Sequence, residues 1–171
     1  MGTLTVDNLN LAGTSVTQVG KVLQVQSAFK SDTDSTTSTS DVAISGLSLT
    51  LTPASASNKV LVQFDVGTMG NNYNAHMFFT VYRSIGGGSY SAIGVGTGGG
   101  SYNYGAGSYA ANTMYHTVGH CFLDSPNTTS EITYKLYFRG SSGSYTYYIN
   151  RRSSDDLFRG STSLICMEVK G

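Results

Sequence analysis

The sequence predicts an all-β protein, an antiparallel β-sandwich that is a jelly roll of eight or nine strands with a short extended N-terminal lead-in. Its 171 residues are the usual size of one domain and can bury a core. Serine, threonine, asparagine, glycine and tyrosine supply most of the polarity, a composition that favours strands and turns. Apolar residues alternate with polar ones in short segments separated by turn residues, and no segment has helical periodicity. An apolar sheet face must close against another, which indicates a sandwich.

The lead-in covers residues 1–20 and has four regularly spaced apolar side chains, too few to form a core alone. Three copies around an axis would bury them mutually, and each buried side chain would contribute roughly 1.5 to 3 kcal/mol. We therefore predict a trimerising neck or docking arm here and a sandwich domain over residues 21–171. The alternatives are a tail without fixed structure and an edge strand on its own domain. The candidate neck residues are Leu4, Val6, Leu9 and Leu11.

The strands of the domain follow from the alternation of apolar and polar residues. Leu23, Val25 and Phe29 alternate with glutamines, which predicts a strand that buries these three side chains. Residues 31–41 are nearly all serine, threonine and aspartate and predict a solvated loop or an edge strand. Further strands are predicted at residues 47–51, 60–66, 77–83, 114–123, 132–139, 145–150 and 163–169.

A glycine- and tyrosine-rich segment, residues 86–107, departs from this pattern. Glycine at this density cannot pack a core and costs much backbone entropy to order, so the segment could be a flexible connection between strands. It could also be a display loop, because loops that are long for their domain are often functional. Under that interpretation the rings of Tyr90, Tyr102, Tyr104 and Tyr109 contact a ligand or a neighbouring subunit.

Charge and cysteine content exclude several classes of protein. Ten basic residues balance ten acidic ones, so no surface field attracts nucleic acid, and we expect no nucleic-acid binding. The N-terminus lacks the pattern of a signal peptide, and no apolar run is long enough to span a bilayer, so we expect no membrane insertion. Cys121 and Cys166 are predicted to be free, buried thiols on strands, since one bridge is not a disulfide framework.

None of the residue patterns that could carry chemistry is complete. Residues 94–99 match the dinucleotide-binding pattern G-x-G-x-x-G, but no helix pattern follows them. His116 and His120 share one face of a predicted strand without further metal ligands in a recognisable spacing. Asp32 and Asp34 are not part of an EF-hand loop. We therefore expect a non-enzymatic protein with no catalytic residues, no cofactor and no metal.

Two stretches are similar to a known family. Residues 20–25 read GKVLQV, and residues 46–62 read GLSLTLTPASASNKVLV. With them the chain resembles a family of phage structural proteins, many of them from marine phages and their prophages. The resemblance extends over nearly the whole chain except the glycine- and tyrosine-rich segment. The other matching phrases lie at residues 3–13, 123–138 (LDSPNTTSEITYKLYF), 148–151 (YINR) and 163–169 (SLICMEV).

The resemblance implies a virion protein of the tail-fibre, spike or capsid-decoration kind, often trimeric, with a jelly roll similar to those of C1q and tumour necrosis factor. Its expected partners are two further copies in a homotrimer, other virion proteins of the capsid or tail, and a glycan or protein of the host cell surface. Its expected location is the virion, assembled in the cytoplasm of a bacterial host. Two functions stay open: a fibre or spike module that contributes to host attachment, and a capsid decoration protein of the cement or head-fibre kind with a purely structural role.

Overall fold

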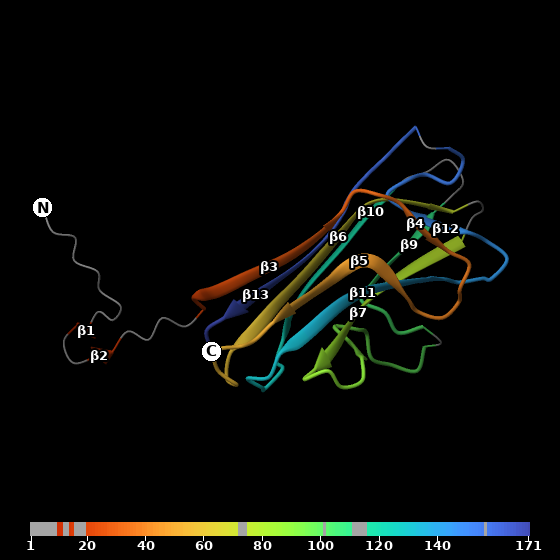
Figure 1. Cartoon of the computed structure of the whole chain (residues 1–171). Coiled ribbons are helices and arrows are strands. Elements are labelled where there is room, and N and C mark those ends of the chain that lie inside the picture. Colours follow the sequence, from red (N-terminus) through yellow and green to blue (C-terminus); the bar gives the residue numbers. More distant parts are fainter. Residues whose placement is uncertain are drawn as a thin grey trace, which may run out of the picture.

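The computed structural model of the chain describes residues 10–11, 14–15, 20–71, 75–100, 102–110, 116–155 and 157–171. All regular elements in these ranges are strands, as Figure 1 shows. The described part of the chain therefore contains no helix that could span a membrane. The predicted all-β class is confirmed.

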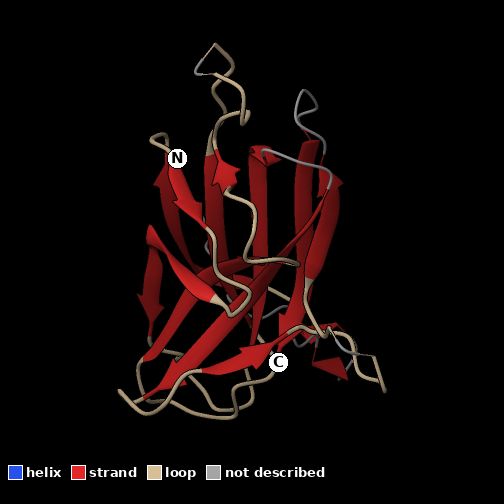
Figure 2. Cartoon of the chain, turned by 90° about the vertical axis from the view of Figure 1, so that its right-hand side faces the viewer, coloured by secondary structure: helices blue, strands red, loops and turns tan. Residues whose placement is uncertain are grey.

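Two antiparallel sheets face each other and form a sandwich (Figures 1 and 2). Outside the sandwich, the short strands β1 (Asn10–Leu11) and β2 (Thr14–Ser15) pair with each other. The first sheet contains β3 (Val22–Lys30), β4 (Asp34–Thr36), β6 (Lys59–Asn71), β10 (His116–Asp124), β12 (Tyr147–Ile149) and β13 (Thr162–Val169). The second sheet contains β5 (Val42–Leu51), β7 (Ala75–Ile85), β8 (Ser91–Ile93), β9 (Ala106–Ala110) and β11 (Ile132–Gly140).

The strand pairing is that of a jelly roll. Three long segments are each divided into two strands: β3 with β4 and β12 with β13 in the first sheet, and β8 with β9 along β7 in the second. When each pair is taken as one segment, the chain has eight. Their order is 1-8-3-6 in the first sheet and 2-7-4-5 in the second, the arrangement of a jelly roll. The strand order, which alternation alone does not specify, follows from this pairing.

The core lies between the sheets and is made of apolar side chains from alternate positions of the long strands. Phe64 of β6 and Phe79 of β7 come from opposite sheets, and their ring centroids are 6.3 Å apart. Phe138 of β11 stacks against Phe79 at 6.4 Å. All three rings are almost completely buried, so these residues hold the two sheets together.

A buried carboxylate fastens β13 to the neighbouring turn and to β3. Glu168 accepts hydrogen bonds from the Ala54 amide at 2.7 Å, from the Asn58 side chain at 2.6 Å and from the Gln24 side chain at 2.6 Å. Burial by itself would raise the pKa of Glu168, but these hydrogen bonds outweigh it and hold the pKa below its usual value. The charged form of Glu168 therefore stabilises the folded state.

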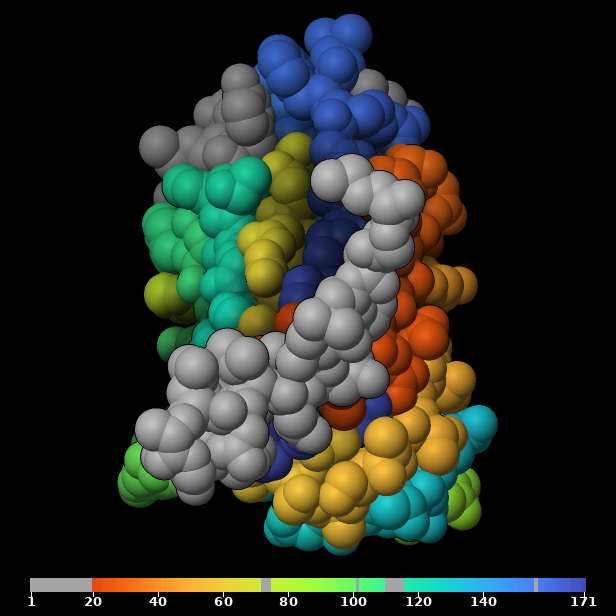
Figure 3. All heavy atoms as spheres, turned by 90° about the vertical axis from the view of Figure 1, so that its left-hand side faces the viewer, coloured from red at the N-terminus to blue at the C-terminus, as the bar shows by residue number. Residues whose placement is uncertain are grey.

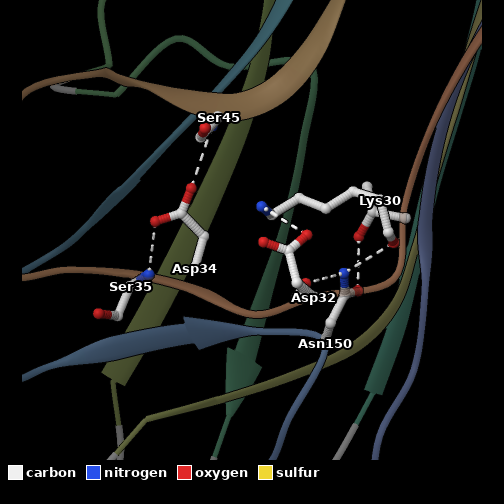
Figure 4. A network of polar contacts seen from close by, with 7 residues as sticks. Lys30, Asp32, Asp34, Ser35, Ser45 and Asn150 are labelled. Atoms are coloured by element: carbon white, nitrogen blue, oxygen red, sulfur yellow. Dashed lines mark hydrogen bonds and ion pairs between the residues drawn. The ribbon is translucent and has the colours of Figure 1, made fainter.

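The segment rich in serine, threonine and aspartate contains the edge strand β4, one of its two predicted forms. Its carboxylates bond to nearby groups of the protein (Figure 4). Asp32 forms an ion pair with Lys30 at 3.0 Å, and Asp34 accepts hydrogen bonds from the amides of Ser35 and Ser45 at 2.8 and 3.0 Å. These aspartates therefore fix the path of the chain between the two sheets.

Strand β3 alternates as predicted, but the prediction of its buried face is wrong. Val25 is 53% exposed and Phe29 is 68% exposed, and Leu23 is exposed as well. Lys30, from the opposite face of the strand, is buried instead. A period of two shows that a strand has two different faces, but pairing with the neighbouring strand decides which one meets the core.

The cysteines are both free, as predicted, but only Cys166 is buried. Cys121 is exposed because it pairs with Gln63 on the outward face of β6, whereas Cys166 pairs with the inward-facing Val62. The prediction that Cys121 is buried is therefore wrong. Burial raises the pKa of the Cys166 thiol, which keeps it protonated and unreactive near neutral pH.

Candidate functional site

The glycine- and tyrosine-rich segment is folded against the second sheet over much of its length. Residues 91–93 form β8 and pair with residues 81–83 of β7. Residues 106–110 form β9 and pair with the other half of β7, residues 75–79. In Figure 1 the green part of the trace accordingly lies beside β7. The segment is therefore more ordered than a flexible connection, and part of the stretch between β8 and β9 returns to β7, where the Gly105 amide donates to the Phe79 carbonyl at 3.0 Å.

Gly94 anchors this stretch. Its φ of +62° lies in the left-handed region, and a Cβ at this position would lie 2.5 Å from the Phe122 ring. The Gly94 carbonyl oxygen lies 3.1 Å from Nε2 of His120. This glycine of the G-x-G-x-x-G match is thus required for close packing, and no helix follows the match in the described part of the chain.

A group of five rings, the aromatic cluster, lies where the segment returns to β7. At its centre Phe78 stacks on Tyr102 with 5.1 Å between ring centroids and an interplanar angle of 18°, and Tyr104 lies at 4.5 Å. The His76 ring is parallel to Phe78 within 10° at 6.2 Å, and Tyr109 meets His76 edge-on at 5.1 Å. Phe78 is only 5% exposed, because the tyrosines cover it on the outer face of the sheet.

The aromatic cluster borders an open pocket of about 360 Å³, which is within the size range of small-ligand sites. Ser141 forms part of its wall. The Ser141 hydroxyl accepts a hydrogen bond from the His76 amide at 3.2 Å, and the Ser141 amide donates to the His76 carbonyl at 3.0 Å. The pocket is lined by His76, Phe78, Gly100, Tyr102, Tyr104 and Ser141.

Arg139 of β11 adds a cation beside the pocket. Its guanidinium carbon lies 5.2 Å from the ring centroids of both Phe78 and Tyr102, a cation–π distance. The Asp41 carboxylate forms an ion pair with Nε of Arg139 at 3.2 Å, and it also accepts a 2.7 Å hydrogen bond from the Tyr82 hydroxyl. Burial and this hydrogen bond raise the pKa of Tyr82 to about 12, so its hydroxyl remains a donor. The cation is therefore balanced by a carboxylate, and the site has almost no net charge.

Such a site offers both apolar and polar contacts to a ligand. Ring faces stack on apolar surfaces such as the C–H face of a sugar, and the hydroxyl and imidazole groups at the rim offer hydrogen bonds. Within the described residues no group of three or more histidine, cysteine, aspartate or glutamate side chains could hold a metal ion. His120 packs its ring against Phe64 and Phe122.

The structure brings together three of the four tyrosines predicted to make contacts: Tyr102, Tyr104 and Tyr109. Tyr90 lies elsewhere, under the ammonium group of Lys135 at 4.6 Å. Lys135 precedes Arg139 by four residues on β11, so the two positions are roughly 13 Å apart. That any of these tyrosines contacts a ligand stays a prediction.

Sequence reasoning did not identify His76, Phe78, Arg139 or Ser141. One signal was present: in the predicted strand at residues 77–83, Phe78 takes a position where alternation expects a polar, outward-facing residue. An aromatic residue on the outward face of a strand needs a cover or a ligand. The other contributors come from separate strands and become neighbours only in the folded sheet.

The predicted neck lies almost wholly outside the residues that the structure describes. Leu4, Val6 and Leu9 lie outside the described residues, and of Leu11 only the backbone strand β1 is described. The neck therefore stays a prediction.

No protein-family model matches the sequence, and the comparison with curated proteins finds no match. Among solved structures, the chain is similar to one titled as infectious bursal disease virus, Gx strain, with a TM-score of 0.43 and 9% identity over 99% of this chain. It is also similar to one of the Gt strain, with a TM-score of 0.47 and 10% identity over 100% of this chain. The chain spans less than half of each matched chain, 44% and 43%. At these scores the similarity carries no argument about function.

Proposed function

We propose that this chain is a structural protein of a bacteriophage virion with no catalytic role. In this proposal it is a trimeric fibre- or spike-type module that contributes to attachment to the host surface. Its place is in the assembled particle, among capsid or tail proteins. The resemblance of its sequence to phage structural proteins supports the class of protein. A jelly roll, whose sheets leave their outer faces available for contacts, is consistent with it.

The pocket at the aromatic cluster is the observation that carries the attachment role. It combines a stacked ring pair at 5.1 Å and a tilted ring pair at 4.5 Å with a nearly neutral polar rim, and it lies on the outer face of the second sheet. Tyrosine offers a large contact area at low entropic cost, and sugar C–H groups stack well on its ring. An uncharged or weakly charged surface glycan of the host is therefore the proposed ligand, with a surface protein as the alternative partner.

Immobilised bacterial surface polysaccharides can test this role. The full-length protein is expected to bind at least one of them. Tyr102→Ala with Tyr104→Ala should reduce that binding at least tenfold, because the stacking surface is lost. Tyr102→Phe with Tyr104→Phe should keep most of it, since the rings remain. Tyr90→Ala is the matched control, because Tyr90 lies outside the aromatic cluster, and it should bind like the unchanged protein.

The second candidate function is capsid decoration with a purely structural role. One observation favours it: the outer face of the first sheet exposes several apolar side chains that could meet another virion protein. Under this alternative the polysaccharides are not bound and the protein instead binds purified phage capsids. Capsid binding that survives loss of Tyr102 and Tyr104 would favour decoration over attachment.

A further inference from the structure

The outer face of the first sheet has an unusual composition. The pairing of β3, β13, β6 and β10 places four apolar side chains, Val25, Met167, Leu61 and Leu123, in one row across the four strands. Figure 3 shows these strands side by side on this side of the molecule, with β10 in teal, β6 in yellow, β13 in blue and β3 in orange-red. A sheet face in contact with water usually carries polar residues at such positions.

Two further apolar residues lie on the same face, outside this row. Ile165 lies on β13 next to Met167 on the same face, and Phe29 lies further along β3. Phe29 is 68% exposed, Leu123 is 56% exposed and Val25 is 53% exposed, so none of these three side chains supports the core. We call Val25, Phe29, Leu61, Leu123, Ile165 and Met167 the apolar face.

The two charges of β6 on this side already have partners in the protein. The Lys59 ammonium donates a 3.0 Å hydrogen bond to Ser125, and Asp65 accepts a 2.9 Å hydrogen bond from Gln63. A partner that packs against the apolar face would therefore leave neither charge of β6 without a hydrogen bond, which lowers the cost of removing water from this side.

The size of the face is sufficient for association. Four strands about 4.8 Å apart and about eight residues long present a projected area of roughly 500 Å². Two such faces in contact would remove roughly 1,000 Å² from water, the lower limit for a specific protein–protein interface. The apolar face takes up part of this area, and exposed apolar patches of a few hundred Å² are often functional.

We infer that the apolar face is the surface through which copies of this chain associate. The inference rests on the self-association in the proposed function and adds where the copies meet. A second copy is the partner that fits, because the same apolar face on each subunit supplies the matching apolar area. Cys121 lies on the same face of β10 as Leu123 and pairs with Gln63. Its exposed thiol should therefore become less reactive when a second copy covers the apolar face.

Two aspartates placed on the two edge strands of the sheet test this inference. In the full chain, Val25→Asp with Leu123→Asp should lower the mass measured by light scattering to the 18.1 kDa of one copy. Since both side chains are more than half exposed, the folded monomer should keep its circular dichroism spectrum. Val25→Ser with Leu123→Ser adds no charge and should raise the concentration needed for association at least tenfold. These serine changes keep the test informative if the aspartates impair folding.

The matched control adds the same charge to the other sheet. Ser48→Asp with Ser91→Asp places two aspartates at exposed positions on β5 and β8, strands of the second sheet, and should leave the mass unchanged. Thiol labelling gives a second readout. Cys121 should react at least tenfold faster in the dissociated variant than in the unchanged protein, and the buried Cys166 should stay unreactive in both.

The outcomes separate this inference from the proposed function. If the unchanged protein is a monomer, self-association itself is wrong and the inference falls with it. If the aspartate and serine variants keep the full mass while the unchanged protein is an oligomer, self-association stands and the inference is overturned. A third result would overturn it too: serines at Leu4, Val6, Leu9 and Leu11 leave the mass of the oligomer unchanged but give a fast-reacting Cys121. That result would identify the lead-in, and not a second copy, as the occupant of the face.

Discussion

The outer faces of the two sheets are built by the same alternation but from different residues. The first sheet presents the apolar face, with Val25, Leu61 and Leu123 in one row. The second sheet presents aromatic and charged side chains, and the Gly/Tyr-rich segment returns along its edge to place two tyrosines over Phe78. The difference teaches that the inward residues make the fold, whereas the outward residues decide what each face can bind.

Two phenylalanines show the contrast most directly. Phe78 and Phe29 both point away from the core, yet Phe78 is 5% exposed and Phe29 is 68% exposed. The rings of Tyr102 and Tyr104 cover Phe78, and within the described residues no ring contact involves Phe29. A covered aromatic residue contributes to the stability of a single chain, whereas an exposed one can contribute only when a partner arrives.

The largest expected effect is the difference in stability between two single substitutions, in which each of these phenylalanines is replaced by alanine. Phe78→Ala should lower the free energy of unfolding by about 3 kcal/mol, the usual cost of removing a buried ring. Phe29→Ala should change it by less than about 0.5 kcal/mol, as at most surface sites. Urea unfolding in the monomeric background of Val25→Asp with Leu123→Asp measures both. Equal losses would mean that the two faces do not differ in the way described.

A smaller effect is expected at the anchor of the Gly/Tyr-rich segment. Gly94→Ala should cost about 2 kcal/mol, because alanine is strained at positive φ and its Cβ would overlap the Phe122 ring. The control is Gly96→Ala, since a Cβ at Gly96 meets nothing within 4 Å, and its thermal unfolding should be unchanged. If both variants unfold like the unchanged protein, the segment does not depend on this contact.

The buried carboxylate behind the apolar face makes stability depend on pH. The pKa of Glu168 is lower in the folded protein than in the unfolded chain, so its contribution is fully present above the ordinary glutamate pKa, about 4.3. That contribution is lost as the pH falls below this value towards the folded pKa. Glu168→Gln should cost about 1 kcal/mol at neutral pH and flatten the fall of the melting temperature in acid. An equally steep fall in the variant would assign the acid sensitivity to other groups.

The smallest expected effect is that of salt on the dissociation constant of the oligomer. This measurement distinguishes association through apolar contacts from association through charges. The apolar face carries no charged residue, and Lys59 and Asp65 beside it are both hydrogen-bonded within the chain. Raising sodium chloride from about 50 mM to about 500 mM should therefore change the dissociation constant of the oligomer by less than about threefold. Sedimentation at both concentrations measures it. A marked weakening by salt would indicate that charges, and not the apolar face, hold the copies together.

The sequence by itself determined the fold class and the positions of most strands. Residues 47–51, 60–66 and 132–139 alternate clearly and lie within β5, β6 and β11. Local alternation is sufficient for this because each strand needs one apolar face to enter a core. The short strands β8 and β9 were not predicted, since glycine-rich sequence has low strand propensity and depends on the edge of β7 for its pairing.

Only the tertiary structure decided which face of β3 meets the core, which cysteine is exposed and which residues form the pocket. Met167 of β13 places Val25 on the outward side, although these residues are far apart in the sequence. In the same way, Phe78, Tyr102 and Arg139 become neighbours through pairing in the second sheet. The physical reason is the period of two: it defines two faces for every strand but assigns neither to the core until long-range pairing sets the register.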